Sequence, residues 1–304
     1  MISQSFSPAA AIRPRELAAY GMILGPGAGL WFVSRHYPAD MPPWGPFEFS
    51  WLIWLAVTLS CFWFLRGLSR LSQRARPGRW RQLAFLAGLA VLYAVTQTQF
   101  EYLAQRMFFI NRIQHVAMHH VGPLLLGLSG AGPVILAGGP GWLRAICHTR
   151  AARATMAVVN QPVVAAVLFV GLFFFWLIPP IHFRAMLDPV LYQVMNWSMA
   201  VDGILFWALI LDRRPKPPAR VGYGTRAALA VGVMFPQIVL GALITFSSSD
   251  LFPYYAFCGR YFPSISAVAD QQIGGIVIWI PPAMMSVLAV LAIVGNIRRA
   301  APAH

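Results

Sequence analysis

Three histidines stand within six residues of one strongly apolar stretch of the chain, as His115, His119 and His120. On an α-helix, His119 lies one turn from His115 and Met118 lies three residues from it, so these side chains should share one face with Asn111. Imidazole and thioether groups are suitable copper ligands, and the thioether favours Cu(I). The spacing therefore predicts a transient copper site at His115, His119 and Met118, with His120 close by.

The same residues have two other interpretations. The histidines can be structural and make only interhelical hydrogen bonds, with Met118 as apolar filler. Bis-histidine haem ligation needs a histidine in a second apolar stretch, and no other long apolar stretch contains one. Pro123 adds a local feature, because it has no N–H to donate to the carbonyl of His119 and leaves that acceptor free beside the imidazoles.

The apolar stretch belongs to a chain with the composition of a membrane protein. Of its 304 residues 58% are hydrophobic and 11% charged, and the mean hydropathy is +0.63, whereas soluble domains carry about a quarter charged residues. A hydrocarbon core of about 30 Å requires roughly 20 apolar residues. Seven stretches meet this length, namely 49–68, 81–100, 106–129, 156–178, 187–211, 226–247 and 272–295. We expect an all-α polytopic membrane helix bundle with seven transmembrane helices.

An eighth apolar stretch, 17–34, contains Gly25-Pro26-Gly27 at its centre. It is interpreted as a possible eighth, N-terminal span, with a re-entrant or interfacial segment as the alternatives. The predicted organisation is an N-terminal arm at 1–44, a membrane domain at 45–297 and a short tail at 298–304.

The positive charge of the chain is unevenly distributed between the apolar stretches. The formal net charge is +14, and Lys216 is the only lysine among 23 basic residues. If the seven stretches alternate, sixteen bases fall on one side: Arg66, Arg70, Arg74, Arg76, Arg79, Arg81, Arg144, Arg150, Arg153, Arg213, Arg214, Lys216, Arg220, Arg226, Arg298 and Arg299. Arg13 and Arg15 join them if 17–34 spans. Such an excess marks the cytoplasmic side. We therefore expect a cytoplasmic C-terminus, contact with the lipid bilayer and no nucleic-acid partner.

The last apolar stretch begins with a polar motif, Asp270-Gln271-x-x-Gly274-Gly275. Asp270 is a good N-cap residue, and the two glycines allow a neighbouring helix to approach closely. The alternative is that Asp270 forms an acidic entrance that draws a cation toward the histidines.

Three further polar residues lie within or beside the apolar stretches, namely Asn196, Asp202 and His182. Ionisable groups in a span are costly and usually pair inside the bundle, so Asp202 is expected to pair with an arginine near the cytoplasmic side, with proton relay as the alternative. His182 either caps the copper site or is a solvated interfacial residue. No ATP-binding loop or nucleophile elbow is found, and we expect no enzymatic activity.

Four segments together resemble the CtaG-type cytochrome c oxidase assembly proteins, which are seven-span bacterial membrane proteins. The segments are Trp80–Gly88, Gln114-His115 followed by Pro123, Gly203–Trp207, and Asp270–Gly275. The resemblance implies a multi-pass protein of the bacterial inner (plasma) membrane that delivers copper to a haem-copper oxidase. Its implied partners are an oxidase subunit or another respiratory assembly protein.

The resemblance also implies histidines at three positions where this chain has Asn111, Asn196 and Leu177. Only His115 matches the implied ligand set. His119 and His120 then either rebuild the site one turn deeper, or the metal role is lost. The second alternative makes the chain a metal-free structural or scaffold subunit of a respiratory complex, and a solute or copper transporter is a third class.

Overall fold

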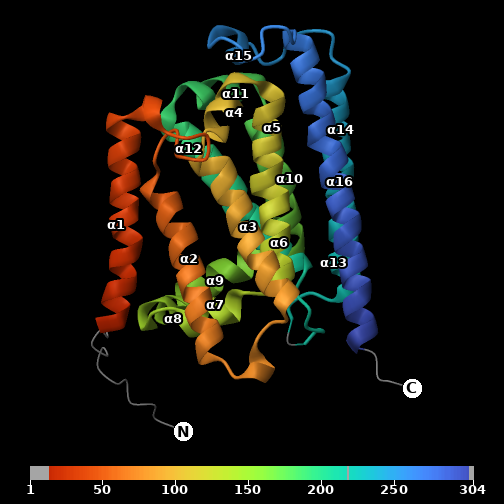
Figure 1. The fold of residues 1–304 in the computed structure, drawn as a ribbon. Coiled ribbons are helices and arrows are strands. Elements are labelled where there is room, and N and C mark those ends of the chain that lie inside the picture. Colours follow the sequence, from red (N-terminus) through yellow and green to blue (C-terminus); the bar gives the residue numbers. More distant parts are fainter. Residues whose placement is uncertain (1–13, 218, 301–304) are drawn as a thin grey trace.

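The computed structural model describes residues 14–217 and 219–300, and every regular element in these two ranges is a helix (Figure 1). Five helices are long and apolar enough to cross a membrane, and up to eight spans result if each of three bent helix pairs counts as one. The expected all-α polytopic membrane bundle is confirmed. Seven spans plus an N-terminal eighth is the upper end of this range.

The N-terminal apolar stretch forms one continuous helix, α1 (Pro14–His36), despite Pro26. It packs on α2 (Trp51–Arg70), where the Trp54 indole donates to the carbonyl of Ile23 at 3.0 Å. A Cβ on Gly27 would lie 2.6 Å from the same indole. The Gly-Pro-Gly sequence therefore makes room for Trp54 rather than breaking the helix, and Leu17–His36 is a candidate span. Residues 1–13 of the predicted arm, with Arg13, lie outside the described ranges, as does the side chain of Arg15.

Three helix pairs are sharply bent. The first is α3 (Arg79–Gln97) with α4 (Phe100–Arg106), at 55°, and the second is Phe108–Ser129 with α7 (Gly132–Gly138), at 72°. The third is α9 (Arg150–Val159) with α10 (Pro162–Trp176), at 73°.

The last of these bends corrects the span expected at 156–178. Residues 156–159 belong to α9, and the next helix begins at Pro162. Proline disfavours helical conformation in the residue before it and is itself well suited to the first helical position. The side chain of Gln161 caps α10 by accepting from the backbone N–H of Val164.

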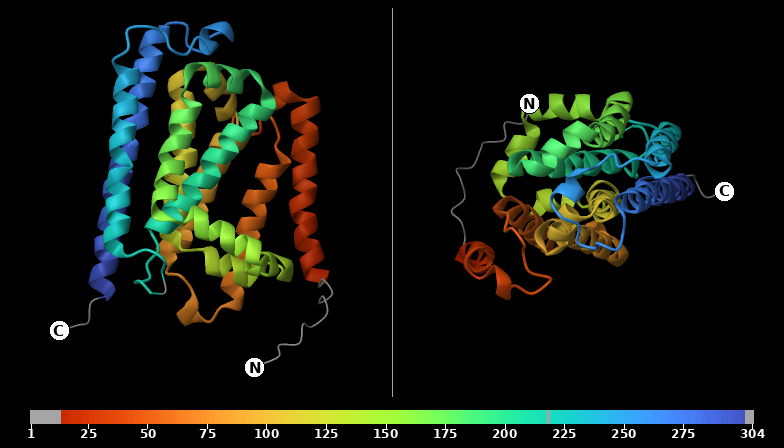
Figure 2. Two further views of the ribbon diagram at one scale, coloured as in Figure 1. Left: turned by 180° about the vertical axis from the view of Figure 1, so that it is seen from behind. Right: turned by 90° about the horizontal axis from the view of Figure 1, so that it is seen from above.

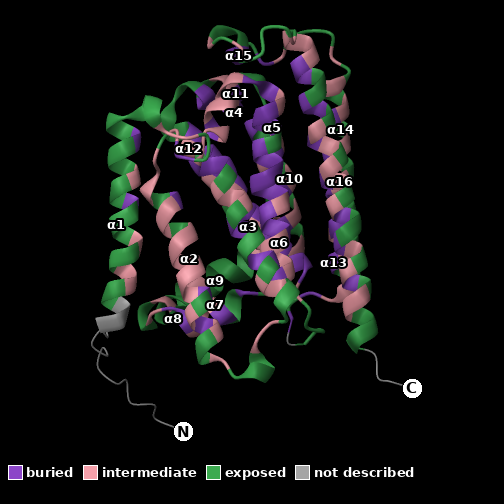
Figure 3. Ribbon diagram, in the orientation of Figure 1, coloured by how far each residue is buried: buried purple, intermediate pink, exposed green. Residues whose placement is uncertain are grey.

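The histidine-bearing span runs through the middle of the bundle and is the most buried segment in Figure 3. It consists of α5 (Phe108–Val116), a π-helical turn η3 (Ala117–Val121) and α6 (Gly122–Ser129). Its neighbours include α3, α12 (Pro189–Ile210) and α16 (Ala267–Ala300).

The remaining helices surround this span (Figure 2). The helices α13 (Tyr223–Gly232) and α14 (Met234–Thr245) pack along α16. Short elements connect the spans; they are η1 (Pro38–Asp40), η2 (Gln73–Ala75), α8 (Gly141–His148), α11 (Pro179–Leu187) and α15 (Tyr254–Phe257).

All segments that carry the sixteen bases lie at one end of the bundle, which we call the basic end. This end holds the α2–α3 connection, α8 and α9, the α12–α13 connection and the C-terminal end of α16 (Figure 1). The other end, with α11 and α15, is called the opposite end. The fold thus gathers on one side the charges that are dispersed along the sequence.

Candidate functional site

The π turn η3 brings the central span into very close contact with α12. A Cβ on Gly203 would lie only 2.5 Å from the carbonyl oxygen of His119. That carbonyl, which Pro123 leaves without its α-helical donor, accepts a hydrogen bond from the indole of Trp207 at 3.2 Å. The proline, the glycine and the tryptophan therefore fix the depth and rotation of the turn that carries the histidines. π-Helical turns of this kind occur frequently at functional sites.

Two of the three histidines make interhelical hydrogen bonds. His119 Nε2 lies 3.1 Å from Asp202 Oδ2 on α12, and His120 Nε2 lies 3.2 Å from Gln237 Oε1 on α14. The two imidazole rings are 4.8 Å apart, and the His119 ring stacks on Phe169 of α10. In both residues the other nitrogen, Nδ1, is buried without a hydrogen-bond partner among the described residues.

The sequence-based expectation that Asp202 pairs with an arginine is wrong, because its described partner is His119. The bases of the basic end lie beyond the end of α12. Gly203 has no side chain, so the backbone of His119 comes close to α12 and the His119 imidazole reaches the Asp202 carboxylate.

His115 is the least satisfied of the three. It is 1% exposed, and neither ring nitrogen makes a hydrogen bond of acceptable geometry within the described residues. Asn196 of α12 lies beside the ring, and its own Oδ1 is also buried without a partner. The positive charge of Arg112 and the ring of His182 are close enough to act on His115 electrostatically. A desolvated imidazole beside an unpaired amide oxygen forms a polar pocket with spare ligand capacity.

His182 is fully buried rather than solvated at the interface. Its Nδ1 lies 3.2 Å from the carbonyl of Trp176, and its Nε2 lies 3.0 Å from the hydroxyl of Tyr255. The helix α11 folds back under the loop that carries α15, so the aromatic side chains of that loop cover the ring. The position of His182 at the end of an apolar stretch predicts that it lies near the membrane interface. It does not predict that the aromatic loop around α15 covers the ring.

Met118 does not face the same neighbours as His119. It packs with Val95 of α3 and with Ala200 of α12, whereas His119 packs on α10. The single face expected for Asn111, His115, Met118 and His119 is an α-helical one, and the π turn changes that register. The candidate site residues thus divide into one group at His115, Met118 and Asn196 and a second at His119, His120 and Asp202.

Sequence reasoning missed three buried methionines near these groups, Met186, Met195 and Met199. Met195 and Met199 are one turn apart on α12, and Met199 lies between the levels of Asn196 and Asp202 on that helix. Asn111 Nδ2 lies 3.9 Å from the sulfur of Met186. The i, i+4 spacing of Met195 and Met199 in an apolar stretch was the only sequence signal for them. Methionines at that spacing are usually packing residues.

Arg112 is the other unforeseen feature, because its place near the end of the span suggests an exposed base. It is 1% exposed, lies over the ring of Phe108 at 4.9 Å and donates to Asn111 Oδ1. Among the described residues it has no ion-pair partner, and its Nε has no hydrogen-bond partner.

The motif that begins at Asp270 is structural in every described contact. The Asp270 carboxylate accepts from the backbone N–H groups of Phe108 at 2.9 Å and Phe109 at 2.7 Å, and pairs with Arg260 at 2.5 Å. It caps α5 rather than its own helix, which already begins at Ala267. Because Asp270 is fully buried and neutralised by Arg260, it does not form an acidic entrance.

The other residues of this motif hold α16 between two neighbours. Gln271 bonds the backbone of Ile244, Ser249 and Leu251 at 2.7 to 3.3 Å. A Cβ on Gly274 would meet the ring of Phe108 at 2.3 Å, and one on Gly275 would meet Thr245 Oγ1 at 2.3 Å. These contacts fix α5 against α14 and α16 and thereby set the position of the histidine-bearing span.

Comparison with known proteins identifies the family. Residues 62–300 match the family model described as cytochrome c oxidase caa3 assembly factor (Caa3_CtaG). The chain belongs to this family. It is a family of assembly factors rather than of enzymes. The matched range contains all four segments on which the sequence resemblance rests.

Two curated relatives are similar to the chain along most of its length. They are uncharacterized proteins of Mycobacterium bovis and Mycobacterium tuberculosis, each 26% identical over 294 residues that cover 87% of this chain. The alignment covers 42% of each relative, so the chain spans less than half of their length. No solved structure matches the chain.

The buried side chains of this family member meet some requirements of a copper site. Within residues 14–217 and 219–300, four buried imidazole nitrogens have no hydrogen-bond partner: Nδ1 and Nε2 of His115, Nδ1 of His119 and Nδ1 of His120. The bond from His119 to Asp202 has the form seen in metal sites, where a ligating imidazole donates its second N–H to a carboxylate. Within the described residues, no three His, Cys, Asp or Glu side chains are grouped as metal ligands. The arrangement fits a low-coordinate, soft ion such as Cu(I) better than Zn²⁺, which takes four ligands in structural sites.

Proposed function

We propose that this protein assists the assembly of a haem-copper oxidase by holding Cu(I) transiently as cargo inside the bundle. The proposed ligands are His115 and His119, helped by Met118 or His120. Membership of the oxidase assembly family supports the assembly role. The observation that carries the metal role is the set of buried imidazole nitrogens without partners, because such groups are costly in a membrane interior unless something binds them.

The two polar groups suggest how the ion is retained. His115 lies at the level of Asn196, and His119 lies deeper, at the level of Asp202. Met199 stands between those levels on α12 and offers a thioether. Two imidazoles with soft neighbours hold Cu(I) weakly enough for transfer, which a cargo site requires.

A binding experiment with paired variants tests the metal role. The detergent-purified full chain is titrated with Cu(I) against a chromogenic Cu(I) chelator. We expect the wild type to take about one equivalent of Cu(I) from the chelator. The His115→Ala/His119→Ala variant should leave the Cu(I) on the chelator. The control is His36→Ala/His148→Ala, which removes two exposed histidines and should retain the equivalent. Unchanged stoichiometry in His115→Ala/His119→Ala contradicts the site.

The metal-free scaffold is the second candidate, favoured by the interhelical bonds from His119 to Asp202 and from His120 to Gln237. In this case the histidines only join helices. A deletion strain separates the two roles. Excess copper partly restores oxidase activity if the protein delivers metal, whereas the scaffold role predicts no rescue by copper.

We propose further that the protein resides in the bacterial inner membrane with its basic end in the cytoplasm. The support is the gathering of sixteen bases at that end, because Lys and Arg in short loops are retained on the cytoplasmic side. The proposed partner, an oxidase subunit or another respiratory assembly protein, contacts the opposite end at the aromatic loop around α15. Phe257 there is 73% exposed and Tyr261 is 49% exposed.

A further inference from the structure

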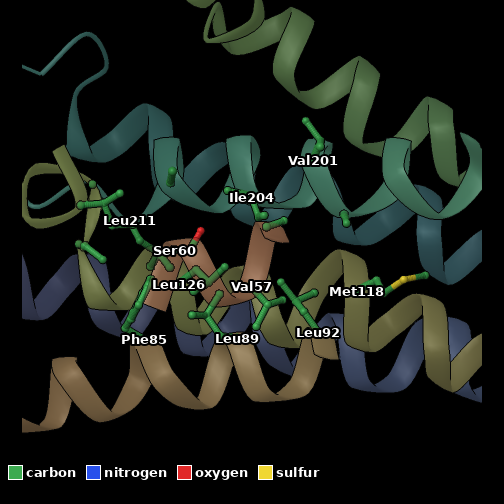
Figure 4. A pocket seen from close by; sticks show the side chains of 18 of the residues that line it. Val57, Ser60, Phe85, Leu89, Leu92, Met118, Leu126, Val201, Ile204 and Leu211 are labelled. Atoms are coloured by element: carbon green, nitrogen blue, oxygen red, sulfur yellow. The ribbon is translucent and has the colours of Figure 1, made fainter. Parts of the chain in front are cut away.

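A long crevice of about 700 Å³ runs along the bundle between α2, α3, α6 and α12. Figure 4 shows its apolar lining, with Val57 and Leu89 on one side, Ile204 on the other and Met118 at one end. The crevice exists because α2 packs mainly on α7 and makes no substantial contact with α12. It does not include His119 or His120, which face α10 and α14, and it touches the first polar group only at Met118 and Asn196, at the end away from the arginines.

The crevice opens sideways on the lipid-facing surface of the bundle. Ala56 on α2 and Ala208 on α12 line it and are exposed, and Val201 lines it and is 47% exposed. Along α12 it extends from Asn196 to the helix end at Leu211, which is about 22 Å at 1.5 Å per residue. One leaflet of a bilayer with a core of about 30 Å is about 15 Å deep. The crevice is therefore long enough to accept a complete acyl chain from the side.

The end of the crevice at the basic end is cationic. Arg81 and Arg213 line it, and both also line a second cavity of about 210 Å³ together with Arg299. Arg213 and Arg299 are close enough to Arg81 to repel it electrostatically. None of these three arginines has an ion-pair partner among the described residues.

The nearest acid does not neutralise this cluster, because Asp212 is already occupied. Its Oδ1 and Oδ2 accept from Arg214 Nε at 3.0 Å and Nη2 at 2.8 Å. Converging guanidinium groups without counter-charge are stabilised by an anion, and Arg binds phosphate in a bidentate manner. Basic pockets between membrane helices at the cytoplasmic side are characteristic binding sites for anionic lipid headgroups.

We propose that the crevice is a binding site for one anionic glycerophospholipid. Its phosphate lies between Arg81, Arg213 and Arg299, and one acyl chain lies along α12 toward Met118. The charge at one end and the length of apolar wall beyond it match the two parts of such a lipid. The site belongs to the leaflet at the basic end, which the proposed topology makes the cytoplasmic leaflet. The phosphate-binding arginines take no part in the copper site, and the acyl chain meets the proposed copper ligands only at Met118. Copper binding and lipid binding are therefore measured by separate experiments, and failure of one leaves the other standing.

Native mass spectrometry of the full chain in detergent measures this binding directly. Phosphatidylglycerol and phosphatidylcholine with identical acyl chains are titrated separately. We expect phosphatidylglycerol to bind with about one equivalent and clearly more tightly than phosphatidylcholine. Inorganic phosphate at the same concentration should not displace it, because phosphate lacks the chain that fills the crevice. Equal binding of the two lipids, or displacement by phosphate, overturns the proposal.

Two pairs of variants test the head and the tail of the lipid separately. Removing two arginines in Arg81→Gln/Arg213→Gln should weaken binding about 30-fold. The control Arg79→Gln/Arg144→Gln removes two exposed arginines of the same end and should change binding little. Ile204→Trp fills the crevice without altering charge and should abolish retention, whereas Val194→Trp, on the exposed face of α12, should not. Wild-type binding by both Arg81→Gln/Arg213→Gln and Ile204→Trp contradicts the site.

Discussion

His119 Nε2 and Asp202 Oδ2 lie 3.1 Å apart in the interior of the bundle and join the central span to α12. The contact is possible because Gly203 lets the two helices approach until their backbones touch. It fixes which imidazole nitrogen faces the carboxylate and leaves Nδ1 turned away, with no partner in the described part of the chain. The hydrogen bond between His119 and Asp202 therefore both joins two helices and sets the orientation of the His119 ring.

Variants at Asp202 test the energetic weight of this pair. Asp202→Asn retains an oxygen that accepts from His119, so we expect the free energy of unfolding to change by less than about 1 kcal/mol. Asp202→Leu leaves the buried imidazole nitrogen without a partner and should cost about 1–3 kcal/mol. Thermal unfolding in detergent measures both. Equal destabilisation by the two variants contradicts the assigned hydrogen bond.

The cap that Asp270 provides for α5 leads to a second prediction. Asp270→Ala removes the acceptor for two backbone N–H groups and leaves Arg260 unpaired, so the expected loss is about 3–5 kcal/mol. Arg260→Gln keeps the cap and should cost less, about 1–3 kcal/mol. The yield of folded protein and the unfolding midpoint report the difference. The assignment fails if Arg260→Gln is the more damaging change.

The glycines of α16 offer a comparison within one helix. Gly274→Ala and Gly275→Ala place a Cβ at 2.3 Å from Phe108 and Thr245 respectively, and overpacking of this kind typically costs about 1–3 kcal/mol. Gly295→Ala meets no atom within 4 Å. It should therefore be neutral or stabilise the helix by up to about 1 kcal/mol, because alanine is the better helix former. Similar unfolding midpoints for all three variants would falsify the packing role.

Trp207 and Pro123 are expected to be energetically coupled through the carbonyl of His119. Trp207→Phe removes the indole donor and should cost about 1 kcal/mol. In a Pro123→Ala background the same change should cost at least about 0.5 kcal/mol less. The reason is that residue 123 then has an N–H that can reach the freed carbonyl. A double-mutant cycle on unfolding free energies measures the coupling, and strict additivity argues against it.

Thiol labelling in intact cells tests the proposed orientation. Cys147 is exposed in α8 at the basic end, and a Ser248→Cys change introduces an exposed thiol at the opposite end. In a Cys61→Ser/Cys258→Ser background, a membrane-impermeant maleimide should label residue 248 in intact cells and Cys147 only after permeabilisation. Labelling of Cys147 in intact cells reverses the topology.

Much of the architecture was predictable because apolar length and loop charge are local properties. Stretches of about 20 apolar residues must be helices in lipid, and all seven stretches fall on helices, although Pro162 moves one boundary and α16 extends five residues beyond its predicted stretch at each end. The free carbonyl of His119 also followed from the position of Pro123 alone. Its donor, Trp207, lies 88 residues further along the chain, and the sequence carries no signal that pairs them.

The side-chain partners depended on packing. Asp270 has the residue type of a helix cap, but which helix it caps is decided by where α16 lies relative to α5. His182 and Arg112 occupy positions near the ends of apolar stretches, and only the folding of α11 and the α15 loop over them excludes water.

The sequence by itself determined that this chain is a polytopic helical bundle of the oxidase assembly family, with one basic end and three histidines in a span. The tertiary structure decided how those histidines divide, because the π turn rotates them toward different helices. It also created the crevice, which arises where α2 and α12 do not meet. Hydropathy and charge are properties of single residues and can be read along the chain. Hydrogen-bond partners and cavities depend on which helix faces pack together, and that is decided only in the folded bundle.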